Sequence, residues 1–166
     1  MSKNLKLIKK AQRGDETAFV EVIKEDELRL YNTALRIMGD EQDAADVLQE
    51  TIIAAYKNIG KLKKAKYFYT WLYRILINQC NKYLREKDTY EVLDGDNYSS
   101  IADLEAFNSI EYLVKNLDEK YKIPILLFYQ SGFSVKEIAV ILGEPEGTVK
   151  SKLSRGRSMV KREYEK

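Results

Sequence analysis

Residues 133–161, FSVKEIAVILGEPEGTVKSKLSRGRSMVK, constrain the fold more than any other stretch of the chain. Ser134 and Glu137 stand three residues apart, the spacing of a capping box in which each side chain satisfies the other residue's backbone amide. Gly143 is placed where a helix ends in a left-handed residue, and Pro145 suits the first turn of a following helix. The stretch therefore predicts two short helices joined by a tight corner, a helix-turn-helix.

The second helix of this motif separates its residues by chemistry. Its apolar positions recur at helical spacing: Val149, Leu153, Gly156 and Val160. Between residues 150 and 162 the chain carries six basic residues and no acid: Lys150, Lys152, Arg155, Arg157, Lys161 and Arg162. Hydroxyl side chains and cations on such a helix can contact base edges and phosphates in a major groove of DNA. The alternative is a solvated basic face that only complements the helix dipole.

Composition narrows the functional classes. The chain has 166 residues, 45% of them hydrophobic, which is enough for one modest core or two small ones. It contains no histidine, the commonest general base, and its one cysteine, Cys80, cannot form an internal disulfide. The sequence shows neither a metal-ligating Cys and His cluster nor a signal peptide or membrane span. We therefore expect a non-catalytic protein of the reducing cytoplasm that needs no cofactor and does not insert into a membrane.

The apolar periodicity predicts helices and no strands. The predicted fold is all-α, with a four-helix domain over residues 1–87 and a helix-turn-helix domain over residues 105–166. A linker over residues 88–104 joins them. From residue 88 to residue 105 the chain has six acids and no Lys or Arg, so we expect this linker to be acidic, extended and flexible.

Single residues mark the expected helix ends. Gly14 and Gly39 are placed to end the first and second helices, and Asp15 and Asp40 to cap the second and third. In the second domain, Pro124 removes a backbone donor and predicts a kink.

Charge is segregated along the first domain. From residue 11 to residue 56, eleven acids against four basic residues give −7, and from residue 57 to residue 87, nine basic residues against one acid give +8. Such blocks suggest two partners of opposite charge, although solvated faces can also be biased.

Four of these acids lie on the third predicted helix, about residues 41–59: Glu41, Asp43, Asp46 and Glu50. Its predicted core stripe is Ala45, Leu48, Ile52, Ala55 and Ile59. The predicted outward side holds Asp43, Asp46 and Glu50, with Val47, Ile53 and Ala54 among or beside them. Acids mixed with apolar residues suggest a protein-binding surface. The alternatives are an ordinary solvated face and a nuclease-type metal site built from carboxylates spaced i, i+3, i+7.

The fourth predicted helix, about residues 67–87, also has two distinct faces. Its predicted core residues are Tyr69, Leu72, Leu76, Cys80, Tyr83 and Leu84. The other face collects rings, amides and cations: Tyr67, Trp71, Arg74, Asn78, Asn81, Lys82 and Arg85. Rings stack on unpaired bases and cations follow phosphates, so this face suits single-stranded or unstacked DNA. Alternatively, Trp71 and Tyr67 only cover the helix bundle.

Three motifs follow one another along the chain: DAADVLQETIIAAYKNI, YFYTWLYRILIN and SVKEIAVILGEPEGTVKSKLSRGR. Together they resemble the extracytoplasmic-function (ECF) class of bacterial RNA polymerase sigma factors, over nearly the whole chain. The resemblance implies a protein that joins core RNA polymerase and gives it promoter specificity. It also implies an acidic linker that threads the RNA channel of the polymerase and a membrane-linked anti-sigma factor as partner.

The resemblance assigns residues to three surfaces. Those expected to bind core polymerase are Asp43, Asp46, Gln49 and Glu50. Those expected to bind the unstacked minus-ten strand are Lys61, Lys63, Lys64, Lys66, Tyr67, Trp71, Arg74, Asn78 and Lys82. Those expected to contact the minus-thirty-five duplex are Thr148, Lys150, Ser151, Lys152, Ser154 and Arg155.

The chain departs from the common pattern of that class at several positions. The connector KLKKAK stands where a small Gly- or Ser-containing loop is common, Lys82 where an acid is frequent, and Gly156 where alanine is usual. Glycine weakens a helix by about 1 kcal/mol relative to alanine unless close packing requires it. The alternative functions are an autonomous helix-turn-helix transcription regulator and the carboxylate-metal nuclease.

Overall fold

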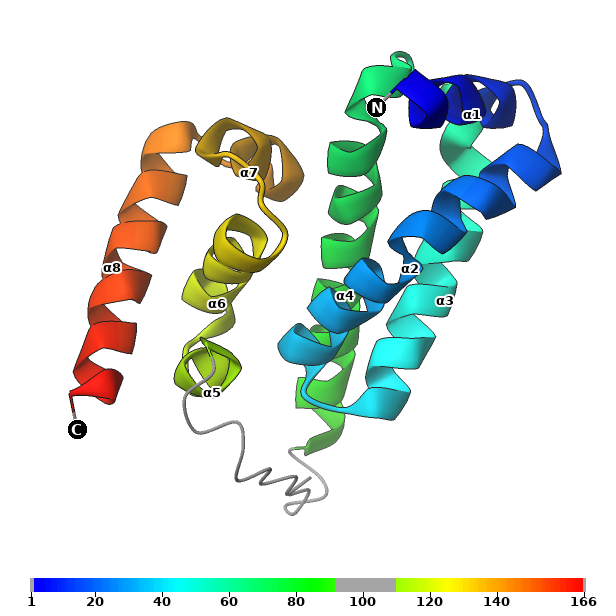
Figure 1. The fold of residues 1–166 in the computed structure, drawn as a ribbon. Helices are drawn as coiled ribbons and strands as arrows, with labels where there is room; N and C mark the ends of the chain where they lie inside the picture. The colour runs from blue at the N-terminus through cyan, green and yellow to red at the C-terminus, as the bar shows by residue number, and fades with distance from the viewer. Residues whose placement is uncertain (1, 92–109, 166) are drawn as a thin grey trace.

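The computed structural model describes residues 2–91 and 110–165, which are helical with short connections (Figure 1). The first unit consists of α1 (Ser2–Gln12), α2 (Glu16–Met38), α3 (Glu41–Asn58), two short 3-10 turns η1 (Ile59–Lys61) and η2 (Ala65–Tyr67), and α4 (Phe68–Glu91). The second consists of α5 (Ile110–Lys115), α6 (Glu119–Ile125), the π-helical turn η4 (Leu126–Gln130), α7 (Val135–Leu142) and α8 (Glu146–Tyr164). None of these described helices is both long and apolar enough to cross a bilayer.

The predicted helix ends in the first unit are confirmed. The Asp15 carboxylate accepts from the Ala18 amide at 3.0 Å, and the Asp40 carboxylate accepts from the Asp43 amide at 2.9 Å. Gly39 has φ +71°, the left-handed conformation that a glycine adopts without strain. These contacts join residues three or fewer positions apart, so local sequence is enough to predict them.

The helix-turn-helix is confirmed as well. Ser134 Oγ accepts from the Glu137 amide at 3.1 Å, and Glu137 Oε1 accepts from the Ser134 amide at 3.2 Å. Gly143 then ends α7 at φ +66°. The helix changes from α to π geometry directly after Pro124 and Ile125, close to the kink that the sequence predicted.

The predicted core stripe of α3 is wrong in part. Ala44 and Val47 are fully buried, whereas Ala45 is exposed. The buried stripe also includes Thr51, whose hydroxyl donates to the Val47 carbonyl at 2.7 Å. Because this hydroxyl is hydrogen-bonded within the helix, the Thr51 side chain can face the core. The buried face of α3 is therefore rotated about the helix axis relative to the predicted one.

The boundaries at the linker are only partly visible. Helix α4 continues to Glu91, four residues beyond the predicted end of the first domain at residue 87. The remainder of the predicted linker and the start of the second domain, residues 92–109, lie outside the described residues.

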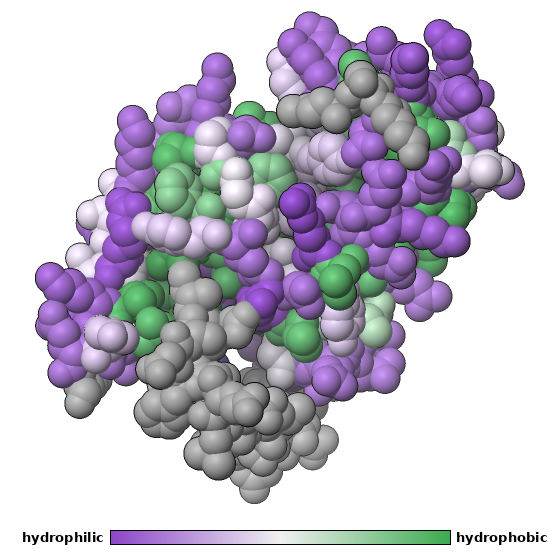
Figure 2. Space-filling model, viewed as in Figure 1, coloured by the Kyte–Doolittle hydropathy of each residue, from purple (hydrophilic) through white to green (hydrophobic). Residues whose placement is uncertain are grey.

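The two units pack against each other, with α7 of the second in contact with α4 of the first (Figure 1). The Tyr73 and Phe133 rings meet edge to face with centroids 4.8 Å apart, and Thr33 Oγ1 lies 3.4 Å from Ser131 Oγ. Figure 2 shows that hydrophobic residues on the visible face, outside the grey segments, form separate patches among hydrophilic ones. Helix faces that point away from this junction, or that border it, remain accessible to partners.

Candidate nucleic-acid and protein interfaces

The acidic residues of α3 form one accessible surface. Gln49 and Glu50 are exposed, and Asp43 and Asp46 are half-buried. The Asp43 carboxylate accepts from Lys87 Nζ of α4 at 3.3 Å. Sequence reasoning missed this ion pair. Because Asp43 is paired with Lys87, the exposed Glu50 carboxylate is more available to a partner than the Asp43 carboxylate.

The negative potential of this surface extends to the neighbouring helix. Burial, followed by the charges of Asp46 and Glu50, raises the pKa of Tyr83 on α4 above its ordinary value. The negative electrostatic potential of the α3 acids thus extends to α4, and such a potential can attract a cationic partner. The described part of the chain contains no group of three or more His, Cys, Asp or Glu residues placed to hold a metal, so the structure does not bring the α3 carboxylates together as a nuclease centre would require.

Apolar side chains border the acids at the C-terminal end of α3. Ile53 is 40% exposed, as the sequence predicted, and Tyr56 is 47% exposed. The Tyr56 hydroxyl donates to Glu16 Oε1 of α2 at 2.8 Å. Sequence reasoning missed Tyr56, which lies three residues after Ile53 and therefore on the same helix face. The surface combines charge with exposed apolar area, as protein-binding surfaces do.

The basic loop before α4 forms a second surface. Its four lysines are exposed: Lys61, Lys63, Lys64 and Lys66. Gln12 of α1 anchors the loop by donating to the Leu62 carbonyl at 2.7 Å, so the backbone is held while the cations remain free to point outward. Lys66 Nζ lies 4.9 Å from the centre of the Tyr67 ring, which is 52% exposed.

The polar stripe of α4 continues from this loop. Arg74, Asn78 and Lys82 are exposed, whereas Trp71 is half-buried with its ring 5.9 Å from that of buried Phe68. Tyr67 is therefore open for stacking, whereas Trp71 packs partly buried against the core of the bundle. The structure brings the loop lysines and this stripe together along one side of the first unit.

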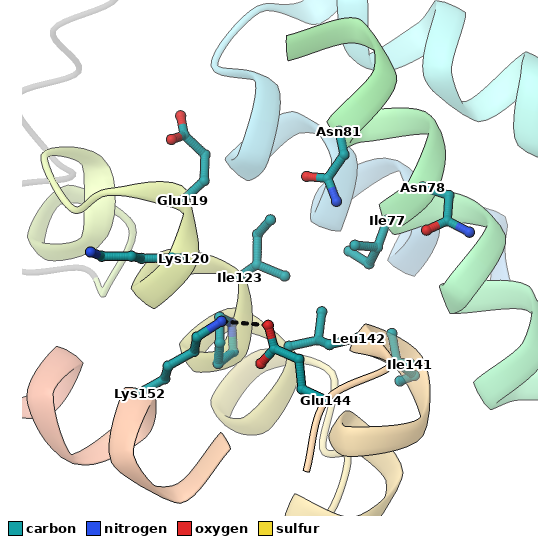
Figure 3. Close-up of a pocket in the computed structure, with 11 residues that line it drawn as sticks. Ile77, Asn78, Asn81, Glu119, Lys120, Ile123, Ile141, Leu142, Glu144 and Lys152 are labelled. Atoms are coloured by element: carbon teal, nitrogen blue, oxygen red, sulfur yellow. Dashed lines mark hydrogen bonds and ion pairs between the residues drawn. The ribbon is translucent and has the colours of Figure 1, made fainter. Parts of the chain in front are cut away.

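A cleft of about 270 Å³ lies between part of α4 and the second unit (Figure 3). Asn78 and Asn81 line it from α4, and Lys120 lines it from α6. Beside it, Arg74 Nη2 lies 3.9 Å from the position that a Cβ atom on Gly143 would take. The second unit thus borders the α4 stripe in this conformation.

Helix α8 carries the third surface. Five of its predicted DNA-contacting residues are exposed: Thr148, Lys150, Ser151, Ser154 and Arg155. Lys152 differs, because it is half-buried and its Nζ contacts Glu144 Oε1 at 2.5 Å (Figure 3). The opposite side of α8 is buried through Val149, Leu153 and Gly156, as predicted.

The largest pKa shifts occur away from these surfaces. Burial raises the pKa of Asp26 to about 6, with Arg29 Nη1 3.7 Å from its Oδ1. Burial likewise raises the pKa of Tyr73 on the facing helix α4, and lowers the pKa of Lys122 in the second unit. These groups belong to the interior and to the junction between the units.

Comparison with known proteins agrees with the helical fold. Residues 22–89 match the family described as sigma-70 region 2, and residues 107–160 match sigma-70 region 4. The chain is 32% identical to the ECF RNA polymerase sigma factor SigW of Bacillus subtilis, over 95% of both chains. It is 31% identical to the ECF RNA polymerase sigma-E factor of Haemophilus influenzae, over 93% of this chain and 91% of that one.

Two solved structures are also similar. CnrH in complex with the cytosolic domain of CnrY matches with a TM-score of 0.79 and 23% identity, over 98% of this chain and 97% of that one. The sigma factor RpoE in complex with the anti-sigma factor NepR, from Bartonella quintana, matches with a TM-score of 0.75 and 25% identity, over 87% and 94% of the two chains.

The chain belongs to the ECF family of bacterial RNA polymerase sigma factors. It binds core RNA polymerase and promoter DNA and directs promoter-specific initiation of transcription. This assignment confirms the resemblance noted in the sequence, and it favours a sigma factor over an autonomous helix-turn-helix regulator. Sigma factors are not a family of catalytic enzymes.

Proposed function

We propose that three surfaces divide the work of this sigma factor. The acidic and apolar face of α3 docks onto core polymerase, the basic loop with the α4 stripe holds the unstacked minus-ten strand, and α8 reads the minus-thirty-five duplex. The observation that carries this proposal is the segregation of charge: acids gather on α3, while exposed cations gather on the loop, on α4 and on α8. Binding to polymerase and to the chromosome also places the protein in the cytoplasm, as a non-catalytic specificity subunit.

The basic loop and the α4 stripe, the proposed minus-ten surface, combine aromatic rings for stacking on bases with lysines for neutralising phosphates. The exposed ring of Tyr67 can stack on a base, and each stacked base is worth about 1–3 kcal/mol. The loop lysines neutralise phosphates, which makes binding dependent on salt. Extruding a base costs a few kcal/mol, so stacking on the rings has to compensate for it.

Promoter binding requires the two units to move apart. The minus-ten and minus-thirty-five elements lie about 25 base pairs apart, which is roughly 85 Å at 3.4 Å per base pair. A compact chain of this length has a radius of gyration of about 15 Å, so the packed arrangement cannot reach both elements. Because α7 packs against α4 in the free protein, we also expect the protein without polymerase to bind duplex DNA poorly.

This chain is also proposed to bind an anti-sigma factor, by analogy with the similar sigma factor that was solved with NepR. Such a partner would compete with polymerase for the protein. The proposal rests on the similarity and on the accessible surfaces described above, and it assigns no particular residue to the anti-sigma contact.

Run-off transcription tests the proposed function. Purified protein with core polymerase is expected to yield discrete products from a subset of promoters in a genomic library, whereas core polymerase alone is not. The absence of any defined product would overturn the proposal.

The separation of the units can be followed by fluorescence energy transfer. Leu28 and Val140 are 71% and 52% exposed on the first and second units, so cysteines at these positions accept dyes while buried Cys80 does not. Transfer between Leu28→Cys and Val140→Cys is expected to fall when core polymerase and promoter DNA are added. Unchanged transfer in an active complex would contradict separation.

A further inference from the structure

Tyr129 lies in the π-helical turn that follows α6. The Ser131 amide donates to the Leu126 carbonyl, five residues earlier, at 3.1 Å, so this turn holds one residue more than an α-helical turn. Leu126 and Leu127 bury the turn in the core, whereas Tyr129 is 49% exposed. The Tyr129 ring meets the Phe128 ring edge to face, with centroids 4.9 Å apart. The backbone and the ring of Tyr129 are therefore held in place while its phenol stays accessible.

The Tyr129 hydroxyl is hydrogen-bonded to an arginine of α8. Arg157 Nη1 lies 3.2 Å from the Tyr129 hydroxyl oxygen. A guanidinium group has only donors, so Arg157 donates and the phenol oxygen accepts. This bond uses one N–H group of the guanidinium and leaves the others for a further acceptor. The exposed Arg157 side chain is thus anchored to a neighbouring segment rather than left free in solvent.

The charge of the acceptor distinguishes this contact from that of Lys152. Lys152 Nζ is paired with the Glu144 carboxylate, whose negative charge offsets that of the ammonium group. The phenol of Tyr129 is neutral, so it holds Arg157 without offsetting the charge of the guanidinium. Such a cation remains able to bind an anion, and guanidinium groups bind phosphate through two parallel hydrogen bonds.

Arg157 also extends a side of α8 that is already proposed to meet DNA. It follows Lys150 by seven residues and Ser154 by three, and Lys161 follows it by four. This spacing places these residues along one side of the helix, and all of them are exposed. The chain has no acid from residue 147 to residue 162, so this side is positive along most of its length.

We propose that Arg157 binds a DNA phosphate beside the minus-thirty-five element, and that Tyr129 is the positioning residue that holds its guanidinium on this side of α8. The proposal rests on the proposed role of α8 and adds to it a residue from outside the helix-turn-helix. An arginine loses rotamer freedom when it is fixed against a phosphate, and one that is already anchored loses less. Phosphate contacts fix the register of a protein on the duplex but do not read its sequence, so the pair adds affinity rather than discrimination between bases.

The test uses full-length protein in complex with core polymerase, on a promoter fragment recovered from the run-off library. Fluorescence anisotropy measures binding at several salt concentrations, on the intact fragment and on one whose minus-thirty-five segment is scrambled. Arg157→Gln is expected to weaken binding to both fragments by the same factor, about 10-fold. It should also reduce the slope of log K against log salt concentration by about 0.9, the value for one phosphate contact on duplex DNA.

Tyr129→Phe separates positioning from charge. It removes the hydroxyl and keeps the ring and every charge, so binding should weaken by roughly 3-fold with the salt slope unchanged. In an Arg157→Gln background it should have almost no further effect. The matched control is Tyr164→Phe: this ring is 72% exposed on α8, and its hydroxyl has no hydrogen-bond partner within residues 2–91 and 110–165. Tyr164→Phe should match the parent, and capture of core polymerase and the melting temperature should be the same for all variants.

The possible outcomes separate the steps of the proposal. An unchanged salt slope for Arg157→Gln, or a loss confined to the intact fragment, would overturn the phosphate contact. Unchanged binding by Tyr129→Phe, an equal loss in the Arg157→Gln background, or the same loss from Tyr164→Phe would overturn the positioning role. Arg155→Ala tests the proposed role of α8 separately, because it should reduce discrimination between the two fragments. If it does not, that role fails, and the proposal fails with it.

Discussion

Replacing Gly156 with alanine sets two physical effects against each other. Within a helix, alanine is more favourable than glycine by about 1 kcal/mol. At Gly156, however, the added methyl group would stand 2.3 Å from Ile125 Cδ1 and 3.1 Å from Ile125 Cγ1. Carbon atoms in contact are about 3.5–4.0 Å apart, so one of the helices or the isoleucine must move by more than about 1 Å.

We expect the steric effect to exceed the gain in helix propensity. Ile125 is only 1% exposed, so its terminal methyl cannot turn into solvent. Overpacking of this kind costs about 1–3 kcal/mol, and the required shift points to the upper half of that range. Gly156→Ala should therefore lower the free energy of unfolding by about 1–2 kcal/mol, because helix propensity offsets only part of the strain.

A second substitution should relieve the strain. Ile125→Val removes the Cδ1 atom and by itself costs about 0.5–1.5 kcal/mol, because it leaves a small cavity. Combined with Gly156→Ala, the alanine methyl fills part of that space, so the double variant should be close to the parent. Because the two single losses would largely cancel, the expected coupling between the two sites is about 1.5–3.5 kcal/mol.

Urea unfolding, followed by the helical circular dichroism signal at about 222 nm, measures the differences in the free energy of unfolding between the variants and the parent. Gly147, in the first turn of the same helix, has no atom within 4 Å of the position that a Cβ atom would take, so Gly147→Ala is the control and should be neutral or slightly stabilising. A Gly156→Ala variant as stable as the parent, or a double variant whose losses simply add, would refute the reasoning.

Three further predictions concern the acidic surface and the interior. Asp46→Arg with Glu50→Arg should weaken pull-down of core polymerase without loss of helicity, whereas Glu27→Arg, at an exposed position of α2, should not weaken it. Retained capture by the double variant would show that another face docks. Burial raises the pKa of Asp26 to about 6, so its ionised form destabilises the fold, and Asp26→Asn should be more stable than the parent at pH 8, by at most about 3 kcal/mol. This advantage should shrink as the pH falls below 6, and an equal advantage at pH 5 and pH 8 would contradict the assignment. Burial raises the pKa of the Cys80 thiol to about 12, so a disulfide reagent should label it only as the chain unfolds in urea; rapid labelling of native protein would disprove its burial.

Local features of the fold were predictable because they depend on near neighbours. The capping box of Ser134 and Glu137 and the left-handed Gly143 follow from residue type and spacing, and the structure contains both. The buried stripe of α3 was harder to predict. Alanine and threonine give a weak hydropathy signal, so the sequence allowed two stripes, and packing against α2 and α4 selected the one with Ala44 and Thr51.

The candidate surfaces were predictable as sets of residues, but their pairings were not. Lys87 contacts Asp43 across 44 positions, and Lys152 contacts Glu144 across eight positions and the turn of the motif. No periodicity within one helix reports such contacts. They alter the surfaces, because a cation paired with a carboxylate is less available to DNA.

By itself, the sequence determined the helical class, the helix-turn-helix and the segregation of charge that distinguishes the proposed docking face from the proposed DNA-binding faces. These properties arise from residue type and helical spacing, which act over a few positions. Only the tertiary structure decided that α7 packs beside the α4 stripe. It also gave a reason for glycine at position 156, where α6 and α8 touch. Those outcomes depend on how whole helices pack, which requires contacts between residues far apart in the chain.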